Sequence, residues 1–259
     1  MPGPDLALLL NAAEAAGEIA AKHWRQDPTS WDKPGGAGPV TEADLAVDAM
    51  LRADLTAARP DYGWLSEESG DAADRLGHSH VFIIDPIDGT RAFLAGERTW
   101  AHSLAIAHEG RVTAAVVHLP VREKTYAAET GQGATLNGTP IRARTEAALE
   151  GAKILCNRQT LRPEHWSAGP PPVKQHFRTS LAYRLSLVAE GRYDGMMTLR
   201  DTWEWDIAAG ALIVTESGGQ VTDRTGEALR FNQPTPMAPG VIAAPADLGA
   251  ELRRGLAAP

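Results

Sequence analysis

The sequence between residues 81 and 90 reads Val81-Phe82-Ile83-Ile84-Asp85-Pro86-Ile87-Asp88-Gly89-Thr90. Its four leading apolar residues, most of them β-branched, predict a short buried strand that ends at Ile84. Two aspartates, a proline and a glycine then interrupt the strand, and the residues after Thr90 favour the start of a helix. The segment therefore predicts a strand that carries two carboxylates to its end, directly before a helix.

This arrangement suits metal and phosphate chemistry. Carboxylates bind hard cations through oxygen, and the backbone N–H groups of Gly89 and Thr90 could receive a phosphate oxygen at the helix N-terminus. Pro86 stiffens the turn and removes one donor. On these residues alone a plain turn stays open as the alternative, because Asp-Pro and Asp-Gly are ordinary turn dipeptides.

Further along the chain, the pattern favours layers of helices and strands. A helix is expected over residues 5–25, and a proline- and glycine-rich loop over residues 33–39 leads to a second helix. Two apolar runs, 103–107 and 112–117, flank a short turn and predict a β-hairpin. Alternating strands and helices in the second half of the chain indicate an α/β layer.

Four sequence blocks together resemble the inositol monophosphatase family. The first is Asp85-Pro86-Ile87-Asp88-Gly89-Thr90, which matches the family signature. The others follow the family's order and are Thr41-Glu42-Ala43-Asp44, Ser66-Glu67-Glu68-Ser69 and Trp205-Asp206-Ile207-Ala208-Ala209-Gly210. The resemblance spans residues 33–219 and rests on the joint occurrence of the blocks.

The resemblance implies a layered α/β sugar-phosphatase fold, an αβαβα sandwich of two subdomains. Residues 1–145 would form an N-terminal α+β subdomain with an antiparallel sheet and most of the metal ligands. Residues 146–259 would form a C-terminal α/β subdomain that carries the substrate-side residues and Asp206. The family also implies a homodimer.

The resemblance further implies a metal site. Its ligands would be the side chains of Glu67, Asp85, Asp88 and Asp206 and the backbone carbonyl of Ile87, which together would hold two or three Mg²⁺ ions. From the residues alone, two other interpretations stay open. The Glu67-Glu68 pair is typical of a solvated surface, and an acid such as Asp206 stabilises the start of a helix.

The same family pattern implies the catalytic roles. Asp44, Glu67 and Thr90 would hold and deprotonate a water that attacks the phosphorus in line, without a phosphoenzyme, and Gly89 and Thr90 would bind the phosphate. Lithium would inhibit by taking a magnesium position. The local pattern also predicts that Thr41 and Asp44 form a capping box, and both roles can hold for one rigidly placed carboxylate.

The substrate is expected to be a small phosphate monoester, with a 3′(2′),5′-bisphosphate nucleotide favoured. Arg158 lies where nucleotidases of the family tend to have a Ser-Arg pair. Arg184 precedes a Leu-Val-Ala-Glu-Gly run, at residues 187–191, that resembles theirs. Lys33 lies where the family often has a lysine near the active site. Inositol 1-phosphate and histidinol phosphate stay open, and so does a plain surface role for the two arginines.

Composition limits the classes of partner. The chain has 259 residues, is 43% hydrophobic and has a net charge of −8, so it is a poor non-specific binder of nucleic acid. It would also repel a phosphate unless cations intervene. The single cysteine allows no intramolecular disulfide and favours a cytoplasmic location. No apolar run approaches the ~20 residues of a membrane span.

A non-catalytic alternative is a regulator that binds a protein partner, since some relatives of this fold contact the transcription machinery. Intact ligand positions argue for the enzyme. We therefore expect a magnesium-dependent phosphomonoesterase.

Overall fold

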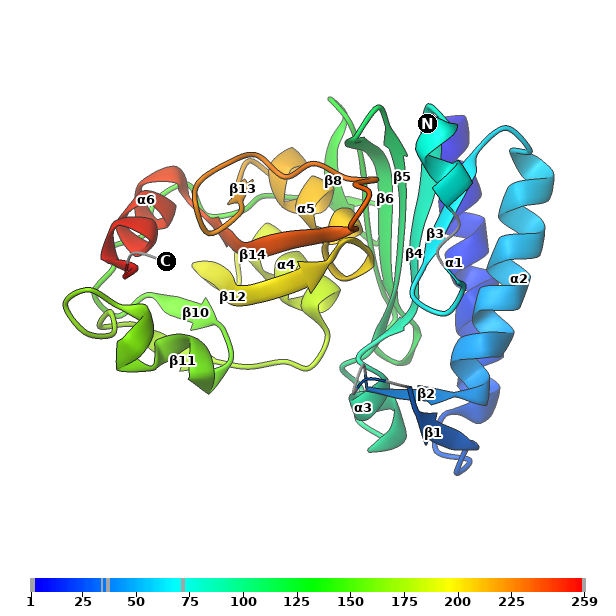
Figure 1. Cartoon of the computed structure of the whole chain (residues 1–259), viewed down its shortest axis with the longest axis horizontal. Coiled ribbons are helices and arrows are strands. Elements are labelled where there is room, and N and C mark those ends of the chain that lie inside the picture. Colours follow the sequence, from blue (N-terminus) through cyan, green and yellow to red (C-terminus); the bar gives the residue numbers. More distant parts are fainter. Residues whose placement is uncertain (1–2, 34, 36–37, 71–72, 258–259) are drawn as a thin grey trace.

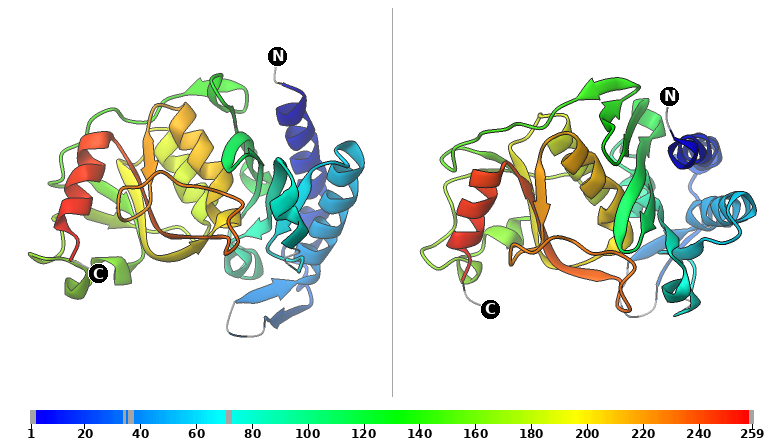
Figure 2. Two further views of the ribbon diagram at one scale, coloured as in Figure 1. Left: turned by 45° about the horizontal axis from the view of Figure 1, so that its top comes forward. Right: turned by 90° about the horizontal axis from the view of Figure 1, so that it is seen from above.

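The structure is a computed structural model that describes residues 3–33, 35, 38–70 and 73–257. In this part of the chain, helices and sheets alternate in five layers: helices, a seven-stranded sheet, helices, a five-stranded sheet and a helix (Figures 1 and 2). The predicted layered α/β sandwich is therefore confirmed. Of the predicted loop at 33–39, residues 34, 36 and 37 lie outside the described residues.

The first layer consists of α1 (Pro4–His23) and α2 (Glu42–Ala58). Both helices bury alanine and leucine faces against one side of the seven-stranded sheet. The predicted capping box starts α2: the Thr41 hydroxyl accepts from the N–H of Asp44, and the Asp44 carboxylate accepts from the N–H of Thr41. This reciprocal pair satisfies two helix-end donors and fixes the Asp44 carboxylate.

The second layer is the larger sheet, in which the strands follow the order of the chain. Its first two strands pair in parallel, and each later neighbour pairs antiparallel, as the hairpin pattern predicted. The strands are β3 (Gly63–Ser66), β4 (His80–Asp88), β5 (Ala101–His108), β6 (Arg111–Leu119), β7 (Lys124–Glu129), β8 (Gly133–Leu136) and β9 (Thr139–Ile141).

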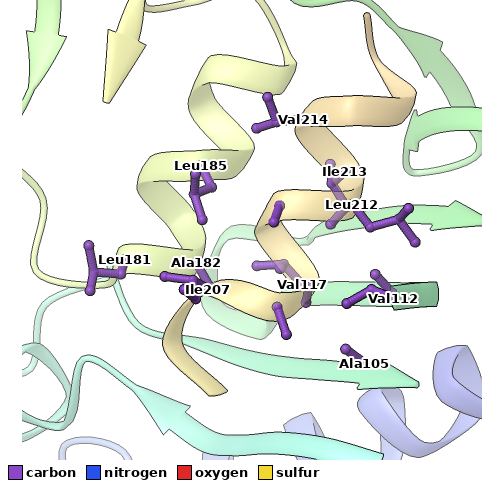
Figure 3. Close-up of a cluster of buried hydrophobic side chains, with 14 of the residues drawn as sticks. Ala105, Val112, Val117, Leu181, Ala182, Leu185, Ile207, Leu212, Ile213 and Val214 are labelled. Atoms are coloured by element: carbon purple, nitrogen blue, oxygen red, sulfur yellow. The ribbon is translucent and has the colours of Figure 1, made fainter. Parts of the chain in front are cut away.

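The middle layer consists of α4 (Leu181–Ala189) and α5 (Glu204–Glu216), which lie side by side between the two sheets (Figure 1). Figure 3 shows Leu181, Ala182 and Leu185 on α4 and Ile207, Leu212 and Ile213 on α5 above strands of the larger sheet. Helix α5 is apolar on nearly all sides because both sheets and α4 contact it.

The five-stranded sheet mixes parallel and antiparallel pairs in the order β11-β10-β12-β14-β13. Helix α6 (Ala246–Gly255) covers its outer face, where Leu248 and Leu252 are buried. The strands are β10 (Lys153–Leu155), β11 (Lys174–His176), β12 (Gly195–Trp203), β13 (Gln220–Thr222) and β14 (Met237–Ala244).

Short elements complete the described fold. A two-stranded arm projects beside α3 (Thr90–Leu94) in Figure 1 and consists of β1 (Ser30–Asp32) and β2 (Pro39–Thr41). The 3₁₀ turns are η2 (Ala73–Gly77), η3 (Pro120–Arg122), η4 (Arg158–Leu161) and η5 (Pro163–His165). No helix among the described residues is long and apolar enough to cross a bilayer.

Strand β4 differs from the prediction, because it continues past Ile84 to Asp88. Its pairing with β5 shifts register between Asp85 and Asp88. Pro86 has no N–H to donate to a ladder, so the strand bulges there. A ring nitrogen of the buried His102 on β5 pairs with the Pro86 carbonyl. This side-chain contact satisfies the carbonyl that the bulge takes out of the ladder.

Candidate metal centre and active site

Three carboxylates from distant parts of the chain meet at one end of the larger sheet. Glu67 follows β3, Asp85 lies in β4, and Asp206 lies in the first turn of α5. One carboxylate oxygen from each lies within 4.8 Å of the others. Ser103 on β5 donates to the backbone carbonyl of Trp205 at 2.9 Å and so holds the start of α5 against the sheet.

The cluster has the properties of a cation site. Both oxygens of Asp85 are buried, and neither has a hydrogen-bond partner among the described residues. Burial, with the nearby charges of Glu67 and Asp88, raises the pKa of Asp85 well above its ordinary value. The pKa of Asp206 is raised by burial and by Asp88 and Glu67. A divalent cation would remove this repulsion and supply the missing partner, so the residues fit Mg²⁺.

Asp88 lies beside this cluster and binds the start of α4. Its Oδ2 accepts from the hydroxyl of Ser180 at 2.7 Å and from the N–H of Ala182 at 2.6 Å. Burial raises the pKa of Asp88 to about 6, although these hydrogen bonds oppose the shift. Ser180 also accepts from the N–H of Tyr183 as the N-cap of α4. The helix N-terminus thereby orients the carboxylate.

Asp44 and Thr90 form a second buried group. The Thr90 hydroxyl lies 3.2 Å from Asp44 Oδ1 and 3.2 Å from the carbonyl oxygen of Ile87. Asp44 Oδ2 accepts from the N–H and the hydroxyl of Thr41 at 2.8 and 2.5 Å. Burial raises the pKa of Asp44 to about 6, against the lowering effect of the Thr41 bonds. At neutral pH its carboxylate is ionised and can accept a proton.

Lys33 reaches the metal cluster from the end of β1. Its Nζ lies 2.8 Å from Glu67 Oε1 and 2.7 Å from Glu68 Oε1. Burial lowers the pKa of Lys33, but the two carboxylates outweigh it and the pKa is raised. The Glu68 side chain is only 3% exposed, and burial raises its pKa to about 7. Glu68 therefore belongs to the site and does not point to solvent.

A cavity of about 150 Å³ opens onto these groups. Gly89 lies in its wall with a φ of 99°, a conformation that favours glycine. The cavity brings together the following residues that the sequence predicted: Glu67, Asp85, Ile87, Asp88, Gly89, Thr90, Arg184 and Asp206. Because α3 starts at Thr90, the first N–H groups of that helix have no partner within it.

Comparison with known proteins shows to which family this arrangement of residues belongs. A model of the inositol monophosphatase family matches residues 4–258. The chain belongs to the inositol monophosphatase family. Over 240 residues it is 34% identical to a protein of Pseudomonas aeruginosa named Nus factor SuhB, with 86% of each chain covered. It is 35% identical over 202 residues to an inositol-1-monophosphatase of Rhizobium meliloti, with 74% of each covered.

Solved structures agree with this assignment. The extragenic suppressor protein suhB of Bartonella henselae superposes with a TM-score of 0.83 at 29% identity, covering 97% of this chain and 98% of that one. Like the other members of the inositol monophosphatase family, this chain is a magnesium-dependent phosphatase.

Two further arginines line the site, although no sequence pattern had assigned them a role there. Arg91 and Arg200 line the metal cavity with Arg184, and all three also line a neighbouring cavity of about 630 Å³. Burial lowers the pKa of Arg184 to about 10, partly offset by Asp88, so it stays charged at neutral pH. Arg91 directly follows the signature block, and this position is a signal that could have identified it. No sequence motif marks Arg200.

The remaining predicted substrate residue, Arg158, lies differently. It is exposed at the start of η4 and is not among the described residues that line either cavity. Its neighbours Asn157 and Gln159 do line the larger one. The Asn157 side chain caps η4 by accepting from the N–H of Gln159 at 3.1 Å.

Proposed function

We propose that this phosphatase hydrolyses a phosphate monoester with a second anionic group, and that a 3′(2′),5′-bisphosphate nucleotide is its substrate. The observation that carries this proposal is the position of Arg91, Arg184 and Arg200, which line both the metal cavity and its larger neighbour. Guanidinium groups bind phosphate oxygens through paired donors. These guanidinium groups would bind both a phosphate beside the carboxylates and a second phosphate in the larger cavity.

In this proposal, Glu67, Asp85 and Asp206, with Asp88 and the Ile87 carbonyl, hold two or three Mg²⁺ ions. When bound, these ions polarise the phosphate and acidify a water. The Ile87 carbonyl oxygen lies 3.2 Å from the Thr90 hydroxyl and carries two lone pairs, so it can bind a cation while Thr90 donates to Asp44.

Thr90, Asp44 and Glu67 position the attacking water. Because the Thr90 hydroxyl donates to Asp44, its oxygen is free to accept from the water. Asp44 then receives the proton, either directly or through Thr90, and Thr41 holds the resulting group in place. The N–H groups of Gly89 and Thr90 bind the phosphate, and attack in line requires no phosphoenzyme.

Lys33 and Arg158 are also proposed to contact substrate. Lys33 is close enough to the cluster to bind a phosphate oxygen once cations have taken Glu67. Arg158 is exposed, so it would reach the substrate only from the rim of the larger cavity.

Inositol 1-phosphate is the alternative substrate, and it is supported by relatives at 35% and 32% identity that are named inositol-1-monophosphatase. Histidinol phosphate is a further alternative. The deciding experiment measures phosphate release at fixed Mg²⁺ from adenosine 3′,5′-bisphosphate, inositol 1-phosphate and histidinol phosphate. We expect the bisphosphate to give the highest kcat/KM. A higher value for either of the other substrates overturns the assignment.

Arg200→Gln tests the second anionic group. Hydrogen bonds to a charged group contribute about 1.5–3 kcal/mol, so KM for the bisphosphate should rise about 10- to 100-fold. KM for inositol 1-phosphate should rise less, because Arg200 would contact only the one phosphate in the metal cavity. Arg254→Gln on the far helix α6 is the matched control. An equal rise for both substrates would show that Arg200 does not bind the second phosphate.

Three further properties are proposed from the family resemblance and composition. Lithium should inhibit phosphate release, since the carboxylate cluster suits small hard cations. The protein should form a homodimer, which light scattering would measure. The single buried Cys156 favours a reducing, cytoplasmic location.

A second candidate function is partner binding, because relatives at 34% and 32% identity are named Nus factor SuhB. The discriminating experiment is a pull-down with wild type and Asp85→Asn. A stoichiometric protein partner bound equally by both would establish a role independent of catalysis. If wild type retains no partner, the regulatory role is rejected.

A further inference from the structure

The larger cavity contains an exposed aromatic side chain. Phe177 directly follows β11, is 46% exposed and lines the 630 Å³ cavity. An apolar ring of this size gains free energy when a ligand covers it. The cavity volume also lies within the ~300–1,000 Å³ range of small-molecule sites.

Arg184 holds this ring in place. Its guanidinium carbon lies 4.5 Å from the Phe177 ring centroid, a cation–π contact. The same guanidinium donates to the backbone carbonyls of Arg178 and Thr179. Because Arg184 also lines the metal cavity, one side chain connects the aromatic ring to the proposed phosphate sites.

Side-chain amides lie in the same cavity. Asn157 and Gln159 line it, and the Asn157 oxygen already accepts a backbone N–H. Its NH₂ group has two N–H donors that a ligand can use. The cavity therefore offers an aromatic ring, side-chain amides and guanidinium groups close together. This combination suits a ligand in which a planar heteroaromatic group is attached to a phosphate.

We propose that Phe177 is a specificity residue that stacks against the base of a nucleotide substrate while Arg184 and Arg200 bind its phosphate. This inference rests on the proposed function and specifies the organic part of the substrate. Stacking of a base on an aromatic side chain contributes about 1–3 kcal/mol. The saturated ring of inositol has no planar π-face to stack, so it gains no such contribution.

The test compares Phe177→Leu, which keeps an apolar side chain, with Phe177→Trp, which keeps an aromatic ring. Phe177→Leu should raise KM for adenosine 3′,5′-bisphosphate about 10-fold, the equivalent of 1.4 kcal/mol, with kcat within about twofold. KM for inositol 1-phosphate should stay unchanged. Phe177→Trp should retain the wild-type KM for the nucleotide.

Binding of adenosine 5′-monophosphate, measured by calorimetry with Mg²⁺ present, separates this inference from the proposed function. If wild type hydrolyses no bisphosphate but binds adenosine 5′-monophosphate, and Phe177→Leu weakens that binding, the substrate assignment fails and the stacking stands. If wild type hydrolyses the bisphosphate and Phe177→Leu leaves its KM unchanged, the stacking is wrong and the function stands. A change of oligomeric mass without a change of KM would identify Phe177 as a protein contact and overturn the inference.

Discussion

Asp85 shows how a single residue can be costly for the fold and necessary for a site. It lies inside a buried strand, and both its oxygens lack a hydrogen-bond partner among the described residues. Most buried carboxylates are paired, because an unpaired one costs several kcal/mol. A cation bound at this cluster would supply the missing partner, which accounts for a buried carboxylate that the fold alone does not need.

Asp85→Asn should reduce kcat/KM at least about 100-fold, because bound metals contribute several kcal/mol to the transition state and each ~1.4 kcal/mol is a factor of ten. In EDTA, its Tm should be no lower than that of wild type, since a buried charge is removed. Addition of Mg²⁺ should raise the Tm of wild type far more than that of the variant.

Asp48→Asn is the matched control, since Asp48 is also buried but accepts from the hydroxyls of Ser66 and Ser69. It should lower Tm and keep the response to Mg²⁺. A response to Mg²⁺ that survives in Asp85→Asn would exclude Asp85 as a ligand.

His118 should make stability depend on pH. Burial lowers the pKa of this histidine to about 4 in the folded protein, whereas the unfolded chain takes up the proton near pH 6.5. The unfolded state therefore binds more protons between these values, and the free energy of unfolding falls as pH drops through this window.

His118→Gln should remove about 1–2 kcal/mol of the stability difference between pH 7.5 and pH 5. Urea denaturation of both proteins at the two pH values measures this difference. Identical pH dependence in variant and wild type would show that His118 titrates normally in the fold.

Sequence patterns identified the residues with strong local signals. Asp85, Asp88 and Asp206 stand within the family blocks, where the sequence predicted a strand end or a helix start, and the structure brings them to one cavity. Arg200 was missed because only tertiary packing places it there, and Ser180 was missed because only packing brings it to Asp88. In the sequence, Ser180 is typical of a helix N-cap, and Arg200 is typical of an exposed charged residue on a strand.

At the scale of elements, α4 and α5 pack so closely that one position requires glycine. A Cβ at Gly210 would lie 2.6 Å from Cβ and Cδ1 of Leu185, which is fully buried. The sequence block contains Ala208-Ala209-Gly210, but no pattern in it predicts the distance between α5 and α4. Strand β4 gives a similar example, since the Asp-Pro pair predicted a strand end where the structure has a bulge supported by His102.

Gly210→Ala should destabilise the protein. Helix propensity favours alanine by about 1 kcal/mol, but overpacking in a core costs about 1–3 kcal/mol, and the Leu185 side chain that the new methyl group would meet is fully buried. Thermal unfolding should give a lower Tm, by about 2–4 °C for each kcal/mol.

Gly249→Ala in α6 is the control. A Cβ there would meet the terminal Nη1 of Arg253 at 3.2 Å, and this flexible side chain can move away. That substitution should leave Tm unchanged or raise it. A higher Tm for Gly210→Ala would contradict the close packing of α4 and α5.

At the scale of the whole molecule, one hydrophobic core joins the two sheets. Its buried side chains come from the larger sheet, α4, α5 and the smaller sheet. The division into subdomains 1–145 and 146–259 remains a prediction. The layer order could be predicted from the family blocks and the alternation of elements, but the shared middle layer follows from contacts between distant segments.

Unfolding should therefore be a single cooperative transition. Far-UV circular dichroism and tryptophan fluorescence should give coincident urea curves, and the calorimetric and van't Hoff enthalpies should agree. Trp100 and Trp166 report on the two sides of the shared core. Two resolved transitions in metal-free protein would show that the subdomains unfold independently.

Asp206 lies late in the chain, on α5, and its position sets how late in synthesis we expect a new chain to become active. The ribosome adds Asp206 121 residues after Asp85, so at ~5–20 residues per second roughly ten seconds separate the two. The strands of the larger sheet are complete at Ile141, whereas α5, which packs on one of its faces, begins only at Glu204. A nascent chain that ends before α5 would lack Asp206, a proposed metal ligand, so we expect such a fragment to have no phosphatase activity.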